Sequence, residues 1–65
     1  MKFEIGQIVI LYRSNKVGKI VGKELWSGMW FYHIDVGTER METDYAQFMA
    51  IATTAQKVLY GAINE

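Results

Sequence analysis

Two glycines inside one strand-like stretch limit the possible folds of this chain more than any other feature. Gly18 and Gly22 lie within residues 17–26, VGKIVGKELW, where most other residues are β-branched, apolar or long. Glycine in a strand interior weakens the strand, and it marks a bulge, a sharp bend or a close approach of two backbones. Two such positions in one strand predict a strongly bent sheet that curls on itself.

Residues 30–36, WFYHIDV, form the clearest strand in the chain because the core-type and polar side chains alternate along it. We expect one face to carry Trp30, Tyr32, Ile34 and Val36 toward the core, and the other face to carry Phe31, His33 and Asp35. The pair Ser27–Gly28 before this strand predicts a turn, so the preceding strand and this one form a hairpin. Two further strands are expected, one within residues 5–12 and a short one at residues 39–43.

Residues 44–63 fit two different structures. In the first, residues 44–47 form a single helical turn, residues 48–52 a short fifth strand, and residues 53–65 a terminal helix. In the second, Asp44 caps a helix with Gln47 as its capping-box partner, and this helix continues to about residue 63. The apolar residues have helical spacing throughout, so periodicity does not decide between the two. The first structure is favoured by β-branched residues in the middle of the region: Ile51, Thr53 and Thr54.

The composition excludes several classes of protein. The chain has 65 residues, no cysteine and one histidine, which rules out disulfides and thiolate metal sites and makes a structural metal unexpected. So small a core is commonly stabilised by self-association or by a partner. Seven basic and seven acidic residues balance, which argues against tight binding of nucleic acid and leaves only weak binding. No apolar run is long enough to span a membrane, so we expect a cytoplasmic protein without membrane contact, metal or cofactor.

The order of these segments resembles the SH3-like small β-barrel in its KOW, Tudor and helicase-accessory forms. The resemblance rests on Phe-x-x-Gly at residues 3–6, Gly-x-Ile at residues 18–20, the aromatic third strand, and the helical turn followed by an apolar strand. It covers residues 3–52 and contains no catalytic motif. It implies a five-stranded, all-β barrel over residues 1–52, with residues 53–65 as an amphipathic helix or tail that packs on the barrel or on a partner. The alternative with one long helix would leave a four-stranded antiparallel sheet.

Two more distant resemblances imply other functions. The segment GKIVG at residues 18–22 is similar to a strand of the type II dihydrofolate reductases, in which four identical barrels enclose one active pore. That family has Val-Gln-Ile-Tyr in its catalytic strand, whereas this chain has Glu-Arg-Met-Glu at residues 39–42. The resemblance therefore implies an oligomer with a pore between subunits, without the catalytic motif. With one long helix, the layout resembles the small single-stranded-DNA-binding coactivators, whose helices dimerise.

Basic and aromatic side chains supply a candidate binding face. Its members are Tyr12, Arg13, Lys16, Lys19, Lys23, Trp26, Phe31 and His33. Aromatic rings on such a face can stack on bases, which contributes about 1–3 kcal/mol per base. A second candidate surface, for self-association or a partner, is the apolar side of the terminal helix: Val58, Leu59, Ala62 and Ile63.

His33 is the only candidate for a histidine general base in the sequence. Asp35 shares its strand face and could contact it, but neither a nucleophile motif nor a phosphate-binding loop accompanies the pair. We therefore predict no catalytic, cofactor-binding or metal-binding residues. The sequence predicts a noncatalytic binding or assembly module, an accessory domain of a nucleic-acid-processing system, whose partner is another protein or a second copy of the chain.

Overall fold

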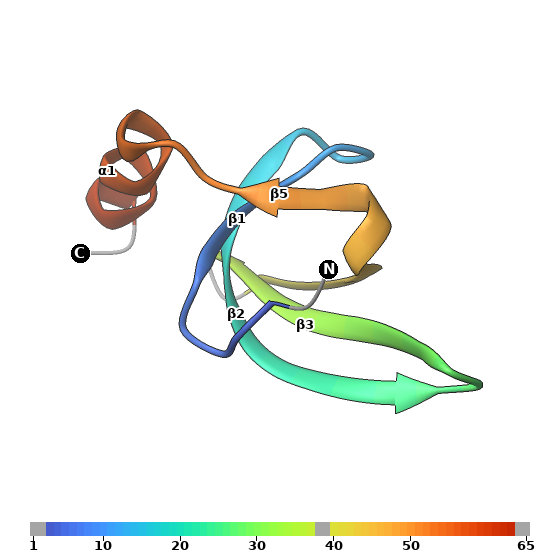
Figure 1. The fold of residues 1–65 in the computed structure, drawn as a ribbon. Helices are drawn as coiled ribbons and strands as arrows, with labels where there is room; N and C mark the ends of the chain where they lie inside the picture. The colour runs from blue at the N-terminus through green and yellow to red at the C-terminus, as the bar shows by residue number, and fades with distance from the viewer. Residues whose placement is uncertain (1–2, 38–39, 64–65) are drawn as a thin grey trace.

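Five antiparallel strands and one C-terminal helix make up the computed structural model, which describes residues 3–37 and 40–63 (Figure 1). The strands are β1 (Ile8–Leu11), β2 (Lys16–Trp26), β3 (Met29–Gly37), β4 (Arg40–Tyr45) and β5 (Met49–Ile51). A 3-10 turn, η1 (Ala46–Phe48), joins β4 to β5, and the helix is α1 (Thr54–Ile63). The strand order β4-β3-β2-β1-β5 confirms the predicted five-stranded sheet. The sheet curls but is not closed into a barrel by pairing of its two end strands among the described residues.

Residues 44–63 therefore form a turn, a strand and a separate helix, and the alternative of one long helix is wrong. Its proposed cap, Asp44, is instead a buried residue of β4. The helix has a different capping box at Thr53 and Gln56, in which each side chain bonds the other residue's backbone N–H. The distances are 3.2 Å from the Gln56 nitrogen to Thr53 Oγ1 and 2.8 Å from the Thr53 nitrogen to Gln56 Oε1.

Strand β2 bends where its sequence carries glycine. The pairing of β2 with β3 shifts register between Ile20 and Gly22, which is the bulge expected there. At Gly18 the backbones approach closely, because an added Cβ would lie 2.8 Å from the carbonyl oxygen of Asp35. The turn from β2 to β3 has positive φ angles at Ser27 (49°) and Gly28 (77°), typical of a two-residue hairpin.

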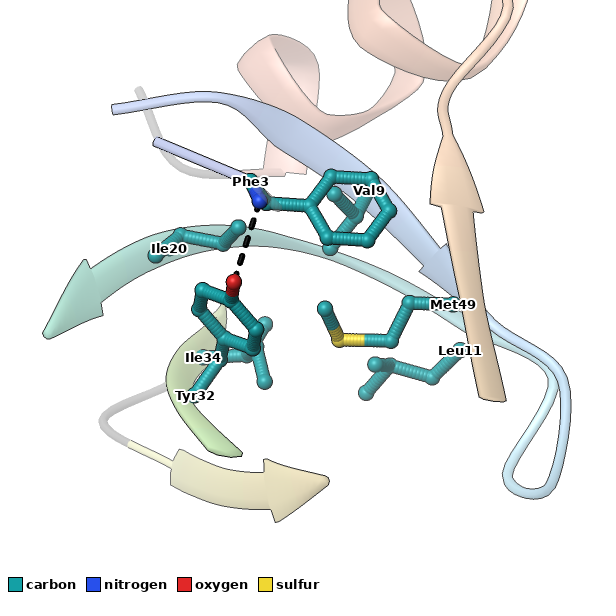
Figure 2. Packing of buried hydrophobic residues seen from close by; sticks show 7 residues of the cluster. All are labelled: Phe3, Val9, Leu11, Ile20, Tyr32, Ile34 and Met49. Atoms are coloured by element: carbon teal, nitrogen blue, oxygen red, sulfur yellow. Dashed lines mark hydrogen bonds between the residues drawn. The ribbon is translucent and has the colours of Figure 1, made fainter. Parts of the chain in front are cut away.

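The core lies on the concave side of this bent hairpin, under β1 and β5 (Figure 2). It consists of Phe3, Val9, Leu11, Ile20, Tyr32, Ile34 and Met49. Trp30 and Val36 pack against it, which confirms the core face predicted for β3. The buried Tyr32 hydroxyl accepts the backbone N–H of Phe3 at 3.0 Å, so the N-terminal segment is fixed across the core.

Side chains fasten the β1–β2 turn to β4, which is an end strand of the sheet. Arg13 Nη2 lies 2.6 Å from Asp44 Oδ1, and Lys16 Nζ lies 3.0 Å from Glu42 Oε2. These two ion pairs bring the β1–β2 turn against β4 without backbone pairing. They also use two of the basic residues that the sequence suggested for a binding face.

Helix α1 packs outside the curled sheet, against β1, β2 and β3 (Figure 1). The Tyr60 hydroxyl donates to Asp35 Oδ2 at 3.4 Å, which ties the helix to the outer face of β3. Burial and the carboxylate of Asp35 raise the pKa of Tyr60 above its usual 10.0.

Candidate binding surface

The end of the β2–β3 hairpin projects beyond the neighbouring strands (Figure 1). Pairing of β1 with β2 ends at Lys19, and pairing of β4 with β3 ends at Phe31. Beyond both points, Leu25 pairs with Trp30 and Trp26 pairs with Met29, and these residues pair with no third strand among the described ones. The large apolar side chains there have no layer to cover them, and their exposed fractions are high: Leu25 58%, Trp26 65% and Met29 45%. We call these three residues the hairpin tip.

Two shallow hollows share Tyr45 as a lining residue, and the first of them borders the hairpin tip at Met29. The first has a volume of about 270 Å³ and is lined by Met29, Trp30, Tyr45, Ala46 and Gln47. The second has a volume of about 240 Å³ and is lined by Arg13, Phe31, Thr43, Asp44 and Tyr45. Small-molecule sites have volumes of about 300–1,000 Å³ and enclose most of their ligand. These open hollows are therefore smaller and less enclosed than a typical small-molecule site.

Ring contacts hold Phe31 in place at the wall of the second hollow. Its ring centroid lies 6.2 Å from that of Tyr45 and 5.5 Å from that of His33, both in edge-to-face geometry. Such pairs are stabilised beyond their buried area by about 0.5–1.5 kcal/mol. Phe31 is therefore a half-buried part of an aromatic cluster, whereas Trp26 is largely exposed.

The basic residues of the predicted face are mostly paired with acids. Besides its ion pair with Asp44, the Arg13 guanidinium lies 4.1 Å from the ring centroid of Phe48. The hydrogen bond to Asp44 raises the pKa of Arg13. The Glu42 pKa is lowered, first by the hydrogen bond from Lys16.

Basic side chains of the β2–β3 hairpin also lie close to carboxylates. Lys23 Nζ lies 3.3 Å from Glu4 Oε2 and 5.4 Å from the ring centroid of Trp30. His33 Nε2 lies 3.0 Å from Glu24 Oε2, so its acidic neighbour is Glu24 and not the predicted Asp35. Asp35 instead accepts the Gly37 N–H at 2.9 Å. Lys19 has no acidic partner within residues 3–37 and 40–63.

The structure does not gather the predicted face on one surface. Strand pairing places Lys19, Trp26, Phe31 and His33 on the outer face of the hairpin. Lys23 stands opposite the buried Tyr32, and therefore on the inner face. Arg13 and Lys16 lie along β4, and Tyr12 is exposed at the end of β1. Sequence reasoning did not select Leu25, Met29 or Tyr45.

The second predicted surface is partly visible on α1. Val58 is 68% exposed and Leu59 is 56% exposed, so the sheet leaves both largely uncovered. Leu59 also borders a hollow formed with Val17 and Val36. The side chains of the other two members, Ala62 and Ile63, lie outside the described part of the structure.

In the described part of the chain, no helix has the length and apolar character needed to cross a membrane. Among the same residues, no cluster of three or more histidine or acidic side chains could hold a metal ion. Comparisons with protein-family models, with curated proteins and with solved structures give no match to this chain.

Proposed function

We propose that this chain is a noncatalytic binding module with an SH3-like small-barrel topology, and that its partner is a protein. The order β4-β3-β2-β1-β5 and the 3-10 turn between β4 and β5 support the topology. Because one fold hosts many functions, the proposal of binding rests on the surface and not on the fold.

The observation that carries the proposal is the exposed hairpin tip. Leu25, Trp26 and Met29 project from the end of a tightly turned hairpin, so a partner can contact them without rearrangement of the sheet. Aromatic residues and methionine are enriched in protein interfaces, and buried tryptophan often contributes a large share of the binding energy. The adjacent hollows at Tyr45 offer places for a partner's side chains.

Charge pairing favours a protein over nucleic acid as the direct partner. Arg13, Lys16 and Lys23 each have a carboxylate within 3.3 Å, so phosphate would have to displace that acid. Nucleic-acid affinity comes largely from basic side chains that neutralise phosphates. The resemblance to KOW and Tudor barrels supports an accessory role in a nucleic-acid-processing system, which we propose is exercised through protein contacts.

The first test is the solution mass by light scattering, at low and high salt, with and without a short single-stranded oligonucleotide. We expect a mass that the oligonucleotide does not change at either salt concentration. A mass increase with oligonucleotide at low salt that disappears at high salt would instead assign direct nucleic-acid binding, because phosphate contacts weaken steeply with salt.

The second test uses the immobilised protein to capture partners from an extract of its source cells. We compare the wild type with Trp26→Ala and with Val58→Ala, since both residues are exposed apolar side chains on different elements. Proteins retained by the wild type and by Val58→Ala, and lost with Trp26→Ala, are the expected result. Circular dichroism confirms that each variant is folded. Retention that is insensitive to Trp26 would remove the hairpin tip from the proposal.

A further inference from the structure

One edge of the projecting hairpin is an unpaired strand edge. The edge of β2 that faces away from β3 makes its last backbone hydrogen bonds at Ile20. Beyond Lys19, where pairing with β1 ends, Ile20 bonds Gly6 at 2.8 Å and Gln7 at 2.9 Å. Residues 21–26 begin at the bulge and have β3 on one side only among the described residues. We call residues 21–26 the free edge of β2.

The turn geometry identifies the backbone groups that this edge presents. Trp26 and Met29 close a two-residue turn, so they form a hydrogen-bonded pair, and such pairs alternate along an antiparallel hairpin. The N–H and C=O groups of Lys23 and Leu25 consequently point away from β3. No hydrogen bond from the described part of the chain reaches these four groups.

Lys23 lies on the free edge of β2, but its charge does not prevent another strand from pairing there. Charged side chains on edge strands commonly prevent pairing with another strand. Lys23, however, lies over the Trp30 ring and is paired with Glu4, and its side chain is only 22% exposed. Its charge is therefore held on the inner face of the hairpin, and no described strand pairs with the backbone edge beside it.

The side chains along the free edge define the chemistry of an incoming strand. Glu24 and Trp26 lie on the outer face, so a residue opposite Glu24 would lie close to both. Glu24 Oε2 already lies 3.0 Å from His33 Nε2, but the Glu24 side chain is 52% exposed, so a lysine or arginine there can pair with its other carboxylate oxygen and lie near the indole ring. The residues on either side of it would face the inner side, where Leu25 is exposed and favours apolar contacts.

The same charge disfavours a second copy of this chain as the occupant. A twofold pairing that uses the backbone groups of both Lys23 and Leu25 places Glu24 directly opposite its symmetry mate. Like charges directly opposite each other on paired strands are destabilising. An extended segment with a basic residue at that position has the complementary charge.

We propose that the free edge of β2 binds an extended segment of a partner protein, as an added strand, with a basic residue opposite Glu24 between two apolar residues. This inference rests on the proposed function, since it names the kind of segment that the binding module takes. Strand addition supplies affinity through backbone hydrogen bonds and specificity through alternate side chains.

The test uses the capped peptide Thr-Val-Arg-Val-Thr and its counterpart with glutamate in place of arginine, titrated into the 65-residue chain and followed by NMR. We expect the arginine peptide to shift the amide signals of Lys23 and Leu25 and to slow their hydrogen exchange. It should bind up to about fivefold more tightly than the glutamate peptide, the range of one cross-strand charge pair. The variant Glu24→Lys should reverse this preference.

The matched control is the arginine peptide with both valines N-methylated, since the methyl groups block the backbone bonds and keep the charge. It should fail to bind. Equal binding of the methylated peptide, or no response of the two amides to either peptide, would overturn the inference. Slowed exchange of these amides as the protein alone is concentrated would overturn it in favour of a second copy. If the inference fails and Trp26-dependent capture persists, the proposed function stands without it.

Discussion

At Gly18, the absence of a side chain is a packing requirement. An added Cβ would press against Ile34 Cγ2 and lie 2.8 Å from the Asp35 carbonyl oxygen, and a backbone oxygen cannot move aside cheaply. We expect Gly18→Ala to lower the free energy of unfolding by about 1–3 kcal/mol, the usual cost of overpacking a core. Urea denaturation followed by tryptophan fluorescence measures the loss.

The matched control is Gly61→Ala on α1, where an added Cβ has no described neighbour within 4 Å apart from adjacent residues and the backbone of the helix itself. Alanine is the better helix former by about 1 kcal/mol, so this variant should be as stable as the wild type or more stable. Equal losses in the two variants would show that the close approach at Gly18 is not the cause.

The ion pair of Glu42 with Lys16 makes the attachment of the β1–β2 turn to β4 depend on pH. The pKa of Glu42 lies below the usual 4.5, chiefly because of the hydrogen bond from Lys16. A carboxyl group whose pKa is lower in the folded state than in the unfolded state stabilises the fold at pH values above its unfolded-state pKa. This stabilisation is lost as the pH falls through the folded-state pKa. NMR titration of the Glu42 carboxyl should show the low pKa, and Lys16→Met should raise it toward 4.5. An unchanged pKa in the variant would contradict this assignment.

At the scale of elements, Tyr60 contributes a hydrogen bond to the contact between α1 and the sheet. Its pKa is raised by burial and by Asp35, so the helix contact is stabilised below pH 10 and weakened as the pH rises through the folded pKa. We expect fluorescence and circular dichroism to report loosening of the helix above pH 10. Tyr60→Phe should lose this pH dependence while the sheet remains folded; a transition that persists in the variant would point to another group.

The sequence predicted elements well where the information was local. Alternation in β3 identified its core face, and β-branched residues placed the break before α1. The capping box was assigned to Asp44, although Thr53 and Gln56 have the same spacing. Asp44 is engaged by Arg13, which is distant in the sequence, and no local pattern reveals that pairing.

The candidate site was harder to predict because exposure at the hairpin tip depends on where other strands end. Alternation assigns a residue such as Leu25 to a face, but only the sheet shows that nothing covers that face there. The partner of His33 was missed for a related reason. Glu24 lies on the neighbouring strand beyond a bulge, and its position depends on a register that sequence alone does not give.

For the whole molecule, the core lies entirely within the strands and the N-terminal segment, since its members span Phe3 to Met49. Helix α1 covers the outer face and contributes no residue to this cluster. We expect a chain that ends after Ala52 to fold cooperatively, with lower stability than the full chain. Urea denaturation and NMR signal dispersion test this, and an unfolded truncated chain would show that the helix is required.

The pairing of β1 with β5, Val9 opposite Ile51, has a kinetic consequence. The other strand pairs join neighbours along the chain, so they close short loops, whereas this pair closes a long one at a larger entropic cost. We expect β5 to pair after the folding transition state. In stopped-flow experiments, Met49→Ala should then mainly speed unfolding, while Ile34→Val in the central hairpin should mainly slow folding. Under this order of events, the shortest strand in the sheet controls how long the native state survives.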